Sequence, residues 1–158
     1  MKNNILQRIM CLSIAILLLS LPITSYAQSS NSKIVNIEYF DDGSRLVTEI
    51  TEQSSLTRAS SSKTGNKTFT YEDSNGNAEW SITLKGTFTY TGSSATCTSS
   101  SVSYNIYDSS WKCTSATAAK SGRNAKGSFT MKKYFGIIVS KTIEKDMNIS
   151  CSNSGTLS

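Results

Sequence analysis

Residues 78–90 read AEWSITLKGTFTY, and this stretch decides the fold class of the chain. Ser, Thr and Lys fill the positions between its apolar residues. Alternation with a period of two puts one set of side chains on one face of a β-strand and the other set on the opposite face. Gly86 lies in the apolar row and predicts a bend or bulge where the strand crosses between two sheets. The apolar row consists of Trp80, Ile82, Leu84, Gly86, Phe88 and Tyr90.

The same period of two continues on both sides of this stretch. Residues 73–77 (DSNGN) contain an Asn-Gly pair, which favours a type I′ turn and predicts a hairpin. Helical periodicity is nearly absent, so we expect an all-β domain, a two-layer antiparallel β-sandwich of about seven to nine strands. The expected strands are residues 33–40, 45–52, 67–72, 78–90, 102–106, one that opens at 111, 126–135, and one or two within 137–151.

The first 27 residues have the features of a cleavable export signal. Lys2 and Arg8 flank a polar start, residues 9–21 are apolar, and Ser25 and Ala27 are the small residues that a signal peptidase reads. The apolar run is shorter than the roughly 20 residues of a membrane-spanning helix. The sequence therefore predicts a signal peptide at 1–27, a single domain over 28–158, and a secreted, extracellular protein without a stable membrane anchor.

Composition excludes several kinds of chemistry. The chain has no His, which removes imidazole-dependent catalysis and His-ligated zinc. The net charge of +5 falls to +3 without Lys2 and Arg8, which makes nucleic acid a poor partner for a secreted chain. We expect no enzyme activity, no cofactor and no metal site. Two alternatives stay open: a pair of carboxylates for glycoside hydrolysis, drawn from Glu38, Glu49, Glu52, Glu72, Glu79, Asp108 and Glu144, and a Ca²⁺ site at Asp73, Asn75, Asn77 and Glu79.

Basic residues gather in the second half of the chain. Residues 109–143 hold seven basic residues and no acidic one, whereas residues 38–52 hold five acidic residues and one basic residue. Aromatic side chains beside lysines suit an anionic glycopolymer, so cell-wall or host glycans are the expected partners. The alternative is that these lysines are solvated charges that discourage pairing between strand edges. The candidate binding residues are Trp111, Lys132, Lys133 and Tyr134.

Two Ser/Thr-rich segments suggest another function. Residues 86–90 and 102–106 each combine one apolar face with one polar face. Strands of this kind can pair with other chains or enter a membrane barrel. Self-assembly or membrane activity is therefore the alternative function, and the oligomeric state stays open.

Four segments carry a resemblance to a known family: 38–44 (EYFDDGS), 80–97, 110–112 (SWK) and 151–158. Together they resemble short secreted proteins of unknown function from Clostridia-type Gram-positive bacteria, over nearly all of residues 28–158. The resemblance implies secretion and a β fold and transfers no catalytic or binding residue. The family pattern has cysteines at the positions of Cys97 and Cys151, and usually an apolar residue at that of Cys113.

Three cysteines remain after residue 27, in a compartment where disulfides form. A Cys97–Cys151 disulfide closes a loop of about 55 residues and stabilises the fold by about 4 kcal/mol in the chain-entropy model. Cys113 shares strand parity with Trp111, which favours a small buried side chain, and a Cys97–Cys113 bridge is the alternative pairing.

Overall fold

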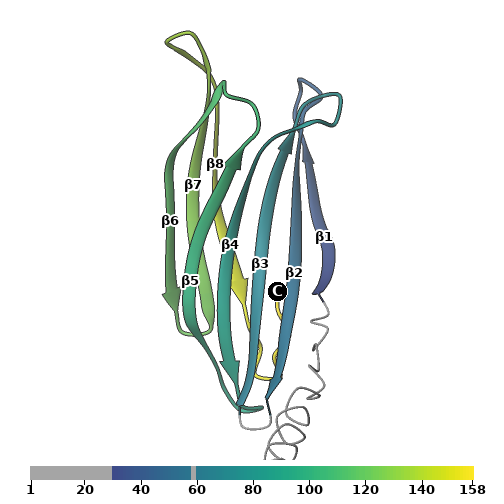
Figure 1. Cartoon of the computed structure of the whole chain (residues 1–158), viewed down its shortest axis with the longest axis vertical. Helices are drawn as coiled ribbons and strands as arrows, with labels where there is room; N and C mark the ends of the chain where they lie inside the picture. The colour runs from purple at the N-terminus through teal and green to yellow at the C-terminus, as the bar shows by residue number, and fades with distance from the viewer. Residues whose placement is uncertain (1–29, 58–59) are drawn as a thin grey trace, which may run out of the picture.

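The computed structural model describes residues 30–57 and 60–158, and the predicted export signal at 1–27 lies outside the described residues. Within those ranges the chain forms eight antiparallel strands, and none of it is a helix long and apolar enough to cross a membrane (Figure 1). One sheet has the order β1-β2-β3-β4-β5 and the other has the order β6-β7-β8, which confirms the predicted all-β, two-layer sandwich. The strands are β1 (Ser30–Tyr39), β2 (Arg45–Thr57), β3 (Ser60–Glu72), β4 (Ala78–Tyr90), β5 (Ala95–Ile106), β6 (Trp111–Ser121), β7 (Asn124–Phe135) and β8 (Ile138–Ser150).

Strand β4 has the alternating burial that its sequence predicts. Trp80, Ile82, Leu84 and Phe88 are fully buried between the two sheets. Ser81 on the opposite face is also buried, and its hydroxyl lies within hydrogen-bonding distance of the Tyr107 hydroxyl, at 3.2 Å. The inner face of this strand is therefore the centre of the core.

The prediction of a sheet crossing at Gly86 is wrong. Gly86 pairs with Gly65 of β3 and with Ser100 of β5, so β4 belongs to one sheet along its whole length. A Cβ at Gly86 would lie 2.7 Å from the Cβ of Ala125 on β7 and 2.7 Å from the Phe88 ring. Glycine is required here because the two sheets approach each other closely, and the chain crosses between them at residues 107–110 instead.

Several polar stretches extend the strands beyond the predicted bounds. Strand β3 begins at Ser60 and β5 at Ala95, although neither stretch has an apolar row. The first part of β3 is paired on both sides, by β2 and by β4, so the neighbouring backbones satisfy its hydrogen-bonding groups. On the outer face hydroxyls pair across strands, as in Thr68 with Thr83 at 2.9 Å. Backbone pairing with neighbours, rather than burial, makes these segments strands.

Aromatic rings from both sheets hold the sandwich together. Tyr71 of β3 stacks on Trp80 of β4, with ring centroids 5.5 Å apart and planes 7° apart. Trp111 of β6 meets both rings edge-on, and Phe129 of β7 meets Trp80 edge-on. Edge-on and stacked aromatic pairs add about 1 kcal/mol each to the burial of their surface. The rings therefore fix how the smaller sheet lies on the larger one.

Candidate functional site

Four turns gather at one end of the sandwich, which we call the apical end: residues 40–44, 73–77, 107–110 and 136–137. Lys141 of β8 points inward here, and its Nζ donates to Asp42 Oδ2 at 2.8 Å, to Ser44 Oγ at 3.0 Å and to the Tyr71 hydroxyl at 2.7 Å. Burial alone would lower the pKa of Lys141, but the hydrogen bonds to Asp42 and Tyr71 outweigh burial and raise it. The hydrogen bonds from Lys141 and Ser44 in turn hold the pKa of Asp42 well below its usual range.

This cluster contains a serine beside a lysine, an arrangement that some hydrolases use. Activation of a serine needs an unprotonated lysine as the base. A raised pKa keeps Lys141 protonated, and the Ser44 hydroxyl is buried, with Tyr71 donating to it at 2.7 Å. The cluster is therefore an ion-pair network that joins β8 to the turn between β1 and β2.

A second inward lysine lies on β7. Lys133 Nζ donates to Glu79 Oε1 at 2.7 Å and lies 3.7 Å from Asp108 Oδ2, while the Trp111 indole N–H donates to Glu79 Oε2 at 2.7 Å. Burial alone would lower the pKa of Lys133, but the hydrogen bond and charge of Glu79 and the charge of Asp108 raise it overall. The Glu79 carboxylate thus accepts hydrogen bonds from a lysine and a tryptophan, and it connects β4 to β6 and β7.

The structure separates the four candidate binding residues into two pairs. Trp111 is 1% exposed and Lys133 is its partner across the β6–β7 pairing, so both belong to the inner face. The prediction that Trp111 binds a ligand at the surface is therefore wrong, because its indole lies in the core. Lys132 and Tyr134 alternate with these residues and lie on the outer face.

The outer face adds a lysine that the sequence analysis did not single out. Lys112 of β6 lies directly opposite Lys132 of β7, and Lys112 Nζ lies 5.2 Å from the centroid of the Tyr134 ring. We call Lys112 and Lys132 the outward lysine pair. Neither has an ion-pair partner within residues 30–57 and 60–158, and the acidic residues of this face, Glu144 and Asp146, lie on β8. Like charges directly opposite each other destabilise a sheet.

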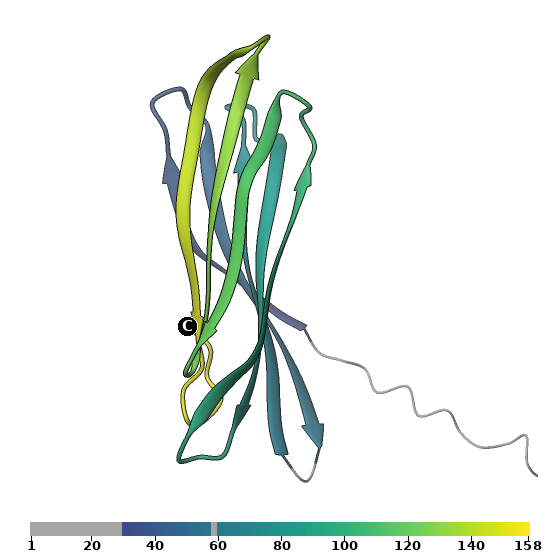
Figure 2. The same ribbon diagram turned by 90° about the vertical axis from the view of Figure 1, so that its left-hand side faces the viewer.

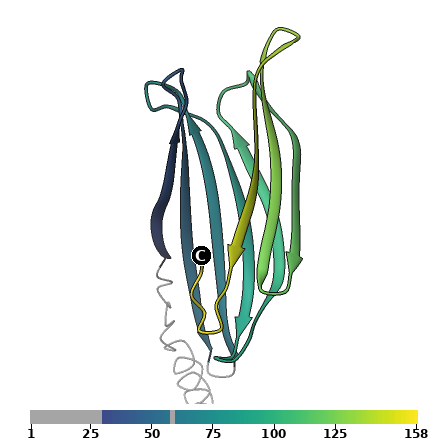
Figure 3. The same ribbon diagram turned by 180° about the vertical axis from the view of Figure 1, so that it is seen from behind.

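The hairpin between β7 and β8 ends in apolar side chains. Phe135 is 82% exposed, Ile137 97%, Ile138 66% and Val139 43%. We call residues 135–139 the apical tip. It extends further than the other three apical turns (Figures 1, 2 and 3). The sequence predicted strand here and gave no sign of this exposure, which arises because the hairpin runs past the opposite sheet.

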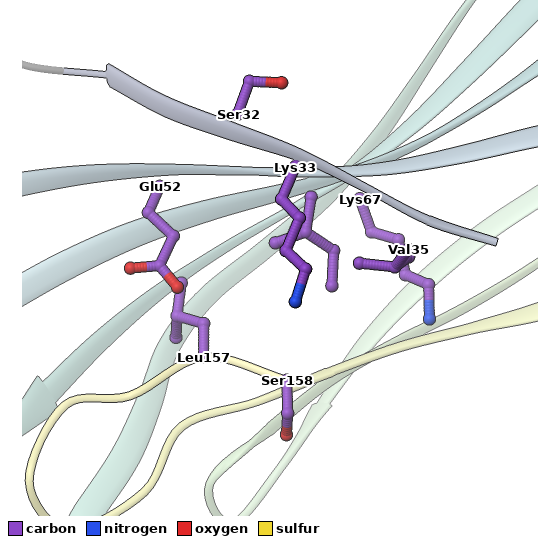
Figure 4. Close-up of a pocket in the computed structure, with 8 residues that line it drawn as sticks. Ser32, Lys33, Val35, Glu52, Lys67, Leu157 and Ser158 are labelled. Atoms are coloured by element: carbon purple, nitrogen blue, oxygen red, sulfur yellow. The ribbon is translucent and has the colours of Figure 1, made fainter.

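A pocket of about 720 Å³ lies where the smaller sheet leaves the inner face of β1 and β2 uncovered. Figure 4 shows Lys33, Lys67 and Glu52 reaching into the space between β1 and the C-terminal segment. Glu52 accepts a hydrogen bond from Lys63 at 3.0 Å, so its charge is already neutralised. The other lining residues are Ser32, Val35, Ile50, Leu157 and Ser158. Its mixed charges do not favour one class of ligand.

Most of the carboxylates considered for glycoside hydrolysis form ion pairs with lysine or arginine. The pairs are Glu38–Lys145, Glu52–Lys63, Glu72–Arg45 and Glu79–Lys133. The proposed Ca²⁺ ligands serve the β3–β4 turn instead, because the Asp73 carboxylate accepts hydrogen bonds from the backbone of Asn75 and of Asn77 and from the Asn77 amide. In the part of the chain that the structure describes, no three acidic or sulfur ligands converge as a metal site needs.

The three cysteines are free thiols in the structure, so the predicted Cys97–Cys151 disulfide is not formed in it. Both residues are nevertheless held by one turn, since the Cys97 N–H donates to the Gly122 carbonyl at 2.8 Å and the Cys151 N–H to the Arg123 carbonyl at 3.1 Å. Burial raises the pKa of each thiol, and the nearby Cys97 raises that of Cys151 further. Cys113 lies at the other end of β6, roughly 30 Å from that turn, which rules out a Cys97–Cys113 bridge.

The outward lysine pair and the apical tip lie on one hairpin and its neighbouring strand. Tyr134 lies between them in sequence, and its ring contacts Lys112. Because Lys132 comes three residues before Phe135, the lysines and the apolar side chains lie close together on the surface. Comparisons of this chain with protein-family models, with curated proteins and with solved structures found no match.

Proposed function

We propose that the protein is a secreted, non-enzymatic binder of an anionic surface outside the cell, and that Lys112, Lys132 and Tyr134 make the contact. The observation that carries this proposal is the outward lysine pair, two like charges facing each other with no acidic partner. Repulsion between the two lysines lowers the stability of the free protein. An anion that lies between the two ammonium groups removes this repulsion and is therefore bound favourably. A polyanionic glycopolymer of a cell wall or of host mucin supplies such anions at regular intervals.

Lysines on an outer face make weak, salt-sensitive contacts. The Tyr134 ring strengthens the site because its face lies against the Lys112 ammonium group and limits the positions that the ammonium group takes. We therefore expect binding that depends on many repeated anionic groups on the ligand rather than on one.

The absence of enzyme activity is supported by the state of the reactive groups. Glu79 and Asp108 lie within 4 Å of a lysine, and the lysine beside Ser44 is protonated. Residues 86–90, considered for self-assembly, have both strand edges paired, by β3 and by β5. Assembly through that segment would require the sheet to open.

Secretion rests on the signal sequence at residues 1–27, and the resemblance suggests a Gram-positive source. In an oxidising medium we expect the Cys97–Cys151 disulfide to form, because adjacent carbonyls of one turn hold both residues. Alkylation of unfolded, unreduced protein recovered from the medium should then label Cys113 alone, as peptide mass spectrometry would show. Labelling of all three thiols would exclude the bridge.

The binding proposal is tested by sedimentation of the purified protein with Gram-positive cell walls and with mucin, at low and physiological salt. The K112M/K132M double variant should lose most binding at low salt, because Met keeps the apolar stem and removes both charges. The matched control, K33M/K85M, removes two exposed lysines from the other sheet and should bind as the parent does. Equal loss in both double variants, or binding that ignores salt, would overturn the assignment to the outward lysine pair.

A further inference from the structure

The apical tip is the most exposed apolar surface of the described chain. Phe135, Ile137 and Ile138 are each more than half exposed, while the large apolar residues of the core are almost fully buried. Apolar surface that is left in water and rimmed by polar residues marks a site of contact with a partner or a membrane.

We infer that the apical tip inserts into the surface of a lipid bilayer with anionic headgroups, while the outward lysine pair contacts the headgroups. The inference rests on the proposed function and names the anionic surface as a membrane. Phe135, Ile137 and Ile138 enter the boundary between headgroups and acyl chains, and the protein stays peripheral.

The backbone of the tip suits this role because its shape is fixed before binding. Phe135 pairs with Ile138, which leaves Gly136 and Ile137 as a two-residue turn. Gly136 has a φ of +62°, and among the described residues positive φ occurs only at glycines, so Ile137 has a negative φ. These signs of φ are those of a type II′ turn, which matches the twist of a hairpin. The exposed side chains therefore need little ordering when they enter a membrane.

The residues below the tip follow the order that a membrane interface favours. Tyr134 comes first, and tyrosine is enriched at the level of the headgroups. Lys132 of β7 and Lys112 of β6 follow, opposite each other and a few residues from the tip. Each lysine near an anionic bilayer strengthens binding by about fivefold. Lys133 and Lys141 are paired with Glu79, Asp108 and Asp42, which neutralises three acidic residues at the apical end.

A second copy of this chain fits the tip less well. A stable protein interface buries about 1,200 Å² or more, and a convex hairpin end with four apolar side chains presents far less. Two copies meeting at their tips would also bring their outward lysine pairs together. A bilayer surface closes around a small convex tip and supplies the opposite charge.

The test measures binding of the purified protein to vesicles of phosphatidylcholine alone and of phosphatidylcholine with phosphatidylglycerol in a three-to-one ratio. We compare the parent with the tip variant F135S/I137S, the lysine-pair variant K112M/K132M and the control I34S/Y39S. The control removes two apolar side chains of β1 that are 58% and 68% exposed. Each variant is also sedimented with cell walls from which lipid has been extracted, and its oligomeric state is measured by size-exclusion chromatography with light scattering.

The parent and the control should bind the anionic vesicles and bind the neutral vesicles weakly. The tip variant should bind the anionic vesicles at least about tenfold more weakly, because it no longer buries two large apolar side chains, yet should bind lipid-free walls as the parent does. Binding of the parent to lipid-free walls but not to anionic vesicles would overturn the inference and leave the proposed function standing. Binding to neither would overturn both.

Two other results would also overturn the inference. One is unchanged vesicle binding by the tip variant, which would mean that the lysines act without insertion. The other is a dimer of the parent that F135S/I137S converts to a monomer, which would assign the apical tip to self-association.

Discussion

Lys132 and Lys133 are neighbours in the sequence with opposite roles, and their substitution by methionine separates those roles. Lys133 points into the sandwich, where Glu79 accepts its hydrogen bond at 2.7 Å. Lys132 points outward, opposite Lys112. Methionine keeps the length and the apolar stem of lysine and removes the charge, so the two variants differ only in what each ammonium group contacts. We expect K133M to destabilise the fold and to leave surface binding at physiological salt unchanged. We expect K132M to weaken surface binding and to leave the fold intact.

The size of the K133M effect follows from the burial of the pair. The Glu79 side chain is 13% exposed and the Lys133 side chain 32% exposed. Breaking a buried pair costs about 3–5 kcal/mol and breaking an exposed pair costs about 0–1 kcal/mol, so a pair between these limits should cost about 2 kcal/mol. Glu79 then keeps the Trp111 indole as a donor but has no close cation. For a domain of this size we expect the melting temperature to fall by about 8 °C.

K132M should change the free energy of unfolding by about 0.5 kcal/mol or less, and in the stabilising direction, because it removes a like-charge contact. Urea unfolding followed by the fluorescence of the two buried tryptophans measures both variants. A double-mutant cycle of E79Q and K133M should give a coupling energy of about 1 kcal/mol or more. The reasoning is refuted if K132M and K133M unfold at the same urea concentration, or if the cycle gives no coupling.

Three further predictions concern the core and the apical end. Trp111→Phe should destabilise the fold by about 1 kcal/mol more than Trp80→Phe, measured by urea unfolding, because the Trp111 indole donates to a carboxylate while the buried Trp80 N–H has no acceptor among the described residues. Gly86→Ala should cost about 1–3 kcal/mol in the same assay, and Ala125→Gly in the same chain should recover part of that loss; an unchanged midpoint would contradict the close sheet contact. The folded-state pKa of Asp42 is lowered, so its contribution to stability is present above the unfolded pKa of about 3.9 and is lost as pH falls below it. The melting temperatures of the parent and D42N should therefore converge between pH 6 and pH 2, and a gap that does not change with pH would count against the Lys141 ion pair.

The fold class and the arrangement of β4 could be predicted because burial follows the alternation of the sequence there. The same alternation also predicts which residues of the candidate site face inward. Phe129, Met131 and Lys133 occupy every second position of β7, so the parity that places Phe129 in the core also places Lys133 on the inner face. Trp111 shares parity with Cys113, which was expected to be buried. Applied consistently, parity would have assigned Trp111 and Lys133 to the interior and left Lys132 and Tyr134 as the outward residues.

Other features could not be predicted because they depend on contacts between distant segments. The Lys141 network joins residues almost 100 positions apart in the chain, and no local pattern links them. The exposure of the apical tip depends on how far one hairpin extends past the opposite sheet. Residues 135–139 have the composition of a buried strand, and only the packing of the two sheets decides that water surrounds them.

The inward and outward lysines of this small sheet depend on each other. Among the described residues, every ion pair between the two sheets joins a carboxylate of the larger sheet or its turns to a lysine of β7 or β8. Examples are Glu38–Lys145, Asp42–Lys141 and Glu79–Lys133. These contacts hold the sheets together, and they also neutralise carboxylates that would repel an anionic surface. The outward lysine pair keeps its charge near the apical tip, because no ion pair of the described residues includes Lys112 or Lys132. Loss of an inward lysine leaves its carboxylate partner unneutralised and should therefore weaken surface binding indirectly, and only at low salt. This loss of binding should increase with the carboxylate charge that is left unneutralised. Loss of an outward lysine removes a direct contact with the surface.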